Sequence, residues 1–135
     1  MTTIEKEKKF LERLLVDERS VLEKLANQAQ GIVGIDKDTG GPVILAPKTK
    51  LTDREQIFLM LLGSYFSYKL GKSKSESLST NAIAEGLGLD YKAASARLSE
   101  LKRERVVETV AKGEHRIVYA NAESMLAGVK SKLAG

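Results

Sequence analysis

The stretch Leu78–Glu108, LSTNAIAEGLGLDYKAASARLSELKRERVVE, decides the fold. Its first part predicts a short helix over 81–86, preceded by a serine and a threonine that can cap it. Gly88 supplies a tight turn, and Asp90 is placed to cap a second helix over 91–105. Two helices joined by a turn of three or four residues form a helix-turn-helix, which the sequence predicts here.

Apolar side chains recur on one face of each predicted helix, as a helix-turn-helix core requires. Small alanines at positions 84 and 94 allow the two helices to approach closely where they cross. The positions expected to face inward are Ile83, Ala84, Leu87, Leu89, Ala94, Leu98 and Leu101.

After the second helix the pattern changes to that of a β-hairpin. Val106–Val110 alternates as a strand does, residues 111–114 suit a turn, and 115–119 form the return strand. The predicted order is therefore helix, turn, helix, hairpin.

This order, with Ile-Ala-Glu at 83–85, Leu-Asp at 89–90, the Ser-x-x-Leu-x-x-Leu pattern from Ser95 and the Val-Val pair at 106–107, resembles the winged helix-turn-helix superfamily of bacterial and archaeal transcription regulators. The resemblance covers about residues 52–120. It implies a protein that binds double-stranded DNA through helix 91–105 and wing 106–119.

In that superfamily the second helix reads bases in the major groove, and the wing often contacts the minor groove or the backbone. A phosphate can also be held at the start of the first helix. The resemblance carried over to this chain implies DNA contacts from Ser79, Thr80, Tyr91, Lys92, Ser95, Ala96, Arg97, Ser99, Lys102, Arg103, Lys112, His115 and Arg116.

The charge balance keeps a second class of function open. Residues 79–120 hold seven basic and six acidic side chains, a net charge of +1, whereas 48–75 alone carry +4. DNA-binding domains are usually more strongly basic. A winged helix that binds another protein, as an adaptor in a larger assembly, is therefore the alternative. The chain also departs from the superfamily by having Arg105 where glycine often follows the second helix.

The segments outside the resemblance are an N-terminal and a C-terminal extension. Residues 3–30 have the period of an amphipathic helix, with Asp17 or Ser20 able to cap a second piece. Residues 31–47 predict a β-hairpin that turns on its glycines. For the N-terminal helix, pairing with a second subunit and folding back onto the chain's own core are equally open.

Two further helices are predicted. Thr52 and Glu55 form a capping box at the start of a helix that is apolar on nearly its whole circumference, which is typical of a core helix. A polar linker over 71–77 follows it. The last helix, capped by Asn121, has an apolar face that suits either a dimer contact or the chain's own core.

The predicted fold class is α+β: mainly α with small β-hairpins, in 135 residues with 42% hydrophobic content. The expected parts are the extension 1–47, the winged helix-turn-helix 48–120 and the C-terminal helix 121–135. Apolar helix surface in excess of one small core predicts a homodimer.

Several classes of site are excluded by composition. The chain has no cysteine and one histidine, so sulfur-containing zinc sites and three-histidine sites are impossible. An Asp-x-Asp-x-Gly run at 36–40 lacks the glutamate that calcium needs at the twelfth position, which is Pro47. We expect no metal, no cofactor and no enzyme activity, and an exposed or DNA-facing role for His115.

The compartment is also predicted. The start, MTTIEKEKKF, mixes acids and bases and is unlike a secretory signal. The longest apolar run, 57–62, is far shorter than the roughly 20 residues of a membrane span. A cytoplasmic protein without a membrane anchor is expected.

Overall fold

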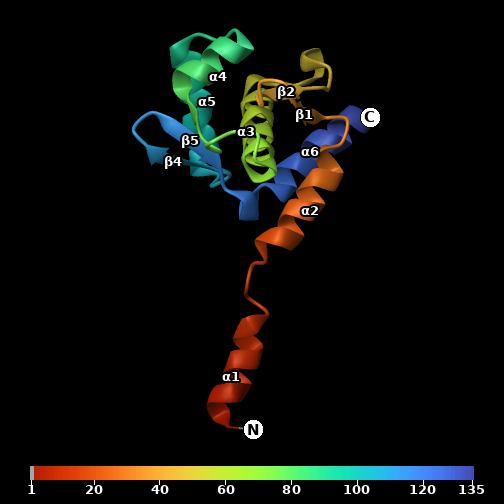
Figure 1. Cartoon of the computed structure of the whole chain (residues 1–135), viewed down its shortest axis with the longest axis vertical. Coiled ribbons are helices and arrows are strands. Elements are labelled where there is room, and N and C mark those ends of the chain that lie inside the picture. Colours follow the sequence, from red (N-terminus) through yellow and green to blue (C-terminus); the bar gives the residue numbers. More distant parts are fainter. Residues whose placement is uncertain (1) are drawn as a thin grey trace.

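A computed structural model describes residues 2–135, and its centre is the helix α3 (Asp53–Leu70) (Figure 1). The predicted capping box opens this helix: Thr52 Oγ1 accepts from the Glu55 backbone N–H at 3.2 Å, and Glu55 Oε1 accepts from the Thr52 N–H at 2.9 Å. Half of its residues are buried, on every side of the helix, because other elements pack around it. The prediction of a central core helix is confirmed.

The elements predicted as helix-turn-helix and hairpin lie along one side of α3 (Figure 1). They are the helices α4 (Thr80–Leu87) and α5 (Tyr91–Arg103) and the strands β4 (Val107–Ala111) and β5 (Glu114–Ile117). A short strand that sequence analysis did not predict, β3 (Leu78–Ser79), pairs with β5. The antiparallel sheet therefore has the order β3-β5-β4, with β5 in the middle.

The predicted N-terminal hairpin is also present and packs against α3. Its strands are β1 (Val33–Ile35) and β2 (Pro42–Ile44), which pair antiparallel. Asp36 Oδ1 accepts from the backbone N–H groups of residues 38 and 39 at 2.9 and 2.8 Å, which fixes the turn. A 3-10 helix, Lys48–Lys50, leads from the hairpin to α3.

The predicted N-terminal helix is broken into two pieces. Asp17 caps α2 (Glu18–Ala29) by accepting from the Arg19 N–H at 3.1 Å. This second piece packs against α6 (Glu123–Ala134), whereas α1 (Thr3–Glu12) projects away from the body (Figure 1).

One helix end and one helix cap differ from prediction. Helix α5 ends at Arg103, because Arg105 has a left-handed φ of 62° and the Val106 N–H closes the turn onto the Leu101 carbonyl at 3.2 Å. Asn121 does not cap α6; it lies in the 3-10 helix Tyr119–Asn121 and donates to the Arg105 carbonyl at 2.8 Å.

The apolar face of α6 is covered by the chain's own core. Leu126 and Val129 are almost fully buried, as is Ala122 just before the helix. They join one apolar cluster that also contains residues of α2, the N-terminal hairpin, α3, α5, β4 and β5. For this helix the own-core alternative is confirmed.

The chain is thus mainly helical with two small antiparallel sheets, the α+β class that was predicted. Among residues 2–135, no helix is both long and apolar enough to cross a bilayer.

Candidate nucleic-acid interface

The turn between α4 and α5 is built by three local devices. Ser79 Oγ accepts from the Ala82 N–H at 3.0 Å and starts α4. Gly88, with a φ of 68°, ends this helix, and its left-handed backbone is the conformation that glycine adopts at least cost. Asp90 Oδ1 then accepts from the Ala93 N–H at 2.7 Å and starts α5. Together they fix the direction in which α5 leaves the turn.

Helix α5 buries one face and presents the other. Ala94, Leu98 and Leu101 are buried, as predicted. The opposite face is exposed and carries a hydroxyl, two cations and two small side chains: Tyr91, Lys92, Ala96, Ser99 and Arg103. We call these five residues the α5 outer face.

The α5 outer face has free positive charge near both ends and small residues between them. Within residues 2–135, no carboxylate lies within 4.0 Å of the Lys92 ammonium or the Arg103 guanidinium. Ala96 and Ser99 let another surface approach the helix closely. This arrangement can bind an anionic partner that has a groove in which the helix fits.

Three more of the predicted contact residues on α5 are half-buried. Arg97 is bound to Glu100 at 3.2 Å, and Lys102 Nζ donates to Thr109 Oγ1 at 3.2 Å. Ser95 lies at the edge of the outer face. Arg97 and Lys102 therefore have partners within the chain, unlike Lys92 and Arg103.

The hairpin β4–β5 supplies one free cation. Lys112 is exposed at its turn, where Gly113 has a φ of 73°. Arg116, by contrast, lies between Glu108 at 2.7 Å and Glu76 at 3.6 Å. The Glu108 hydrogen bond raises the pKa of Arg116, so its charge is permanent but largely neutralised by its neighbours. Glu76 lies in the segment predicted as a linker, so nothing in the sequence pattern marks it as a partner of Arg116.

The prediction of an exposed or DNA-facing His115 is wrong. Its side chain is 4% exposed, and Nε2 lies 2.8 Å from Thr80 Oγ1, which is also buried. Side chains alternate along a strand, so on β5 His115 and Ile117 face the core. Because β3 covers the other edge of β5, that strand is central rather than the edge of a two-stranded hairpin.

His115 instead joins the elements beneath the α5 outer face. Nδ1 lies 3.4 Å from Thr109 Oγ1 on β4, the same hydroxyl that Lys102 of α5 contacts. Burial, followed by the charge of Lys102, lowers the pKa of His115. The neutral ring therefore links the start of α4 to β4, and through Lys102 to α5. Nothing in the local sequence signals this link, since its members are far apart in the chain.

Ser79 and Thr80 are therefore structural. Ser79 is engaged in its helix cap, and the Thr80 N–H donates to the Gly113 carbonyl at 3.1 Å. Two backbone donors near the start of α4, those of Thr80 and Ala82, already have partners in the chain. The start of α4 consequently has fewer free N–H groups with which to bind a phosphate, the contact expected there.

One of the lysines before this region, Lys69, is held by another part of the chain. Lys69 binds Glu18 of α2 at 2.7 Å, and this contact lowers the pKa of Glu18. The backbone of Lys72 lies close to Gly40 in the turn of the N-terminal hairpin. The Lys69 ammonium is therefore not available to add charge to the α5 outer face.

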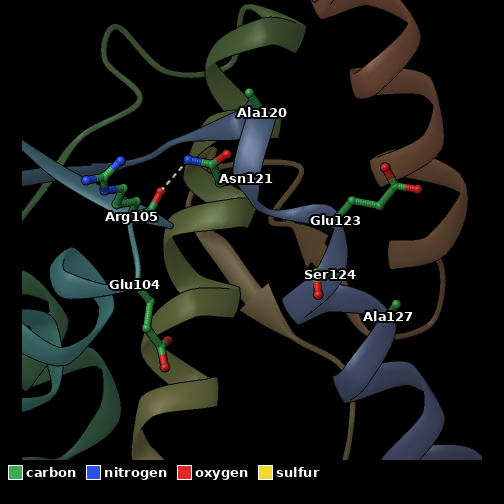
Figure 2. A pocket seen from close by; sticks show the side chains of 7 residues that line it. All are labelled: Glu104, Arg105, Ala120, Asn121, Glu123, Ser124 and Ala127. Carbon is green, nitrogen blue, oxygen red and sulfur yellow. Dashed lines mark hydrogen bonds between the residues drawn. The ribbon is translucent and has the colours of Figure 1, made fainter.

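A hollow of about 660 Å³ lies between the end of α5 and the start of α6. Figure 2 shows Asn121 bonded to Arg105 there, and the Glu104 and Glu123 side chains directed away from each other. These carboxylates do not converge on a common point. No group of three or more acidic or histidine side chains suited to a metal ion exists in residues 2–135.

Comparison with models of known protein families, with curated proteins and with solved structures gave no match. What the α5 outer face does must therefore follow from its geometry and its charge.

Proposed function

We propose that this protein is a winged-helix transcription regulator that binds double-stranded DNA, with α5 in the major groove and the β4–β5 hairpin as its wing. The order α3, α4, α5, β4, β5 is the order that the resemblance implies. The observation that carries the proposal is the α5 outer face, where unpaired cations flank small residues beside a hairpin with Lys112 at its turn.

The dimensions and chemistry of DNA suit this face. The major groove is about 12 Å wide and admits one α-helix. Small side chains in the middle of the helix allow a close approach to base edges, while Lys92, Arg103 and Lys112 reach phosphates or guanine edges. Tyr91 adds a hydroxyl near the helix start, where this class of motif reads bases. The proposal includes a cytoplasmic location and assigns no catalysis.

The test is fluorescence anisotropy with a random-sequence duplex. With about six phosphate contacts, affinity should fall roughly 10³-fold between about 50 and about 200 mM salt. The double variant Lys92→Ala/Arg103→Ala should make the slope of log affinity against log salt less negative by about two, since each phosphate contact contributes about one.

The matched control is Lys24→Ala/Lys130→Ala, which removes the same charge from exposed positions on α2 and α6. Its slope should stay close to that of the unmodified protein. Equal effects of the two double variants would mean that only net charge matters, and the α5 outer face would not be the binding surface.

The second candidate, a winged helix that binds another protein, is favoured by one observation. Arg116 on the wing is enclosed by Glu76 and Glu108, which leaves that strand with little net charge for DNA. Binding to duplex DNA that is millimolar and insensitive to salt would overturn the DNA proposal in favour of this one.

A further inference from the structure

The helix α1 and the segment after it expose several large apolar side chains. No residue of α1 is buried. Six apolar side chains between residues 4 and 16 are each more than half exposed, from 58% for Val16 to 76% for Leu15: Ile4, Phe10, Leu11, Leu14, Leu15 and Val16. We call residues 2–17 the arm. Large apolar side chains gathered in this way on one segment mark an interaction surface.

The arm also needs a partner in order to stay helical. An isolated helix shorter than about 12–15 residues is marginal in water, and α1 has ten residues. Its capping box, in which Thr2 and Glu5 bond to each other's backbone, defines the start of the helix but buries no apolar surface. The helix therefore lacks the stabilisation that packing of its apolar side chains against a partner would supply.

The same chain carries an apolar groove without an occupant. It lies between α2, β1 and the C-terminal end of α3, has a volume of about 390 Å³, and is lined chiefly by Leu22, Ala26, Val33, Ile35, Phe66 and Leu70. Leu70 is 65% exposed at its rim. Lys69 supplies charge at the rim and is already paired with Glu18.

The two surfaces match in charge as well as in polarity. Helix α1 holds three lysines and three glutamates, so it has no net charge to desolvate against the groove. A strongly basic or acidic arm would instead indicate a polyanionic or polycationic partner. Both the groove and the arm are apolar surfaces that the fold leaves uncovered.

From these observations we propose that two copies of the chain exchange their arms, each α1 lying in the groove of the other copy. Figure 1 shows α1 projecting beyond α2, joined to it by the non-helical segment 13–17, so that the arm extends away from its own groove. Two copies placed antiparallel bring each α1 beside the α2 of the other copy. Leu14, Leu15 and Val16 then meet their counterparts at the two-fold axis.

Exchange of the arms buries more surface than a one-sided contact would. A stable interface buries about 800 Å² on each partner, more than one short helix in a groove provides. In a two-fold dimer each copy contributes both an arm and a groove, so the contact is doubled. Helix α6 is not needed for the dimer, because its apolar face is buried in the chain's own core. Helix α3 takes part only through its C-terminal end, where Phe66 and Leu70 line the groove.

Light scattering on the full chain across micromolar concentrations tests the proposal, and a dimer is expected. Two variants separate the surfaces: Leu11→Glu/Leu15→Glu in the arm, and Ala26→Glu in the groove, all at exposed positions that leave the core intact. The arm variant should raise the dimer dissociation constant at least about 100-fold, because each buried leucine contributes more than a factor of ten. The control Lys8→Ala/Lys9→Ala should remain dimeric.

Mixing the two variants distinguishes exchange from folding back. The arm variant keeps an intact groove and the groove variant keeps an intact arm, so an equimolar mixture should form a heterodimer more tightly than either variant dimerises alone. A monomeric unmodified protein at all concentrations would overturn the proposal and indicate that the arm covers its own groove. A dimer that survives both sets of substitutions would also overturn it. The measurements contain no DNA, so they stand apart from the proposed function.

Discussion

At the scale of single residues, His115 gives the molecule its clearest pH response. The ring is the only imidazole in the chain, is buried, and has a pKa lowered by burial and by Lys102. As the pH falls, the unfolded chain takes up this proton before the folded chain does. His115 therefore contributes to stability above its ordinary pKa of 6.5 and loses that contribution as the pH falls below it.

We predict that the free energy of unfolding decreases between about pH 7 and about pH 5, and that His115→Gln makes this decrease smaller. Carboxylates with lowered pKa values, such as Glu18 and Asp36, lose their contribution only at lower pH, near their ordinary values of 4.5 and 3.8. Denaturant unfolding over this range is the measurement. A proton NMR titration giving the folded ring a pKa of 6.5 or higher would contradict the prediction.

Arg105 is the second residue with an individual role. It is the one non-glycine residue of the described chain, 2–135, with a positive φ, 62°. That backbone closes α5 in the way glycine commonly does, with the Arg105 N–H bonded to the Lys102 carbonyl at 3.0 Å and the Val106 N–H to the Leu101 carbonyl. A left-handed backbone costs a residue with a Cβ about 1–2 kcal/mol.

Arg105→Gly should therefore stabilise the protein by up to about 1 kcal/mol, with part of the relieved strain offset by the freer unfolded chain. Arg105→Ala is the matched control, because it removes the same side chain and keeps the Cβ. Thermal unfolding of both variants measures the difference. Equal melting temperatures for the two would show that the left-handed backbone carries no strain here.

At the scale of elements, the contact between α3 and the N-terminal hairpin depends on one missing side chain. A Cβ placed on Gly63 would lie 2.7 Å from the Pro42 Cβ and 3.1 Å from Val33 Cγ2. The hairpin can lie directly on the helix only because position 63 has none. Inserting atoms into such a contact typically costs about 1–3 kcal/mol.

Gly63→Ala is expected to lower the free energy of unfolding by about 1–3 kcal/mol despite alanine's higher helix propensity. Gly128 in α6 provides the comparison, since a Cβ there meets no atom within 4 Å. Gly128→Ala should stabilise by up to about 1 kcal/mol. Urea unfolding of the pair checks both signs, and a stabilising Gly63→Ala would mean that the hairpin moves away from α3 at little cost.

At the scale of the whole molecule, the extensions and the helix-turn-helix share one core. Leu25 of α2, Ile83 of α4 and Leu126 of α6 are all completely buried and belong to the same apolar cluster. The predicted division at residues 47 and 120 marks changes in sequence pattern. Across both positions, however, the apolar contacts are continuous.

We predict that residues 18–134 unfold in a single transition. Leu25→Ala should lower stability by about 2–5 kcal/mol, because a fully buried leucine leaves a cavity, and it should shift the whole transition together. Far-ultraviolet circular dichroism and tyrosine fluorescence report on different parts of the chain and should give coincident curves. Two separate transitions would show that the extension folds independently of the rest.

Much of this protein follows from local patterns in its sequence. The positions of the central helices and of both hairpins are predicted by local features. These features are the apolar periods, the glycine turn at 88, and the caps at Ser79, Asp90 and Thr52. These features depend on residues within four or five positions of each other, so they can be read without knowledge of the fold. The inward-facing positions of α5 can be predicted for the same reason, and so can the exposed positions of this helix, which begin with Tyr91 and end with Arg103.

Only the tertiary structure decided which polar and apolar side chains were covered by distant parts of the chain. His115 is buried because the two-residue strand β3, too short to show a period, makes β5 the central strand. Arg116 pairs with Glu76, which lies forty residues earlier in the chain. The last helix packs against α2. Burial is a property of pairs of surfaces, and the pairing of remote segments is not encoded in the spacing of either one.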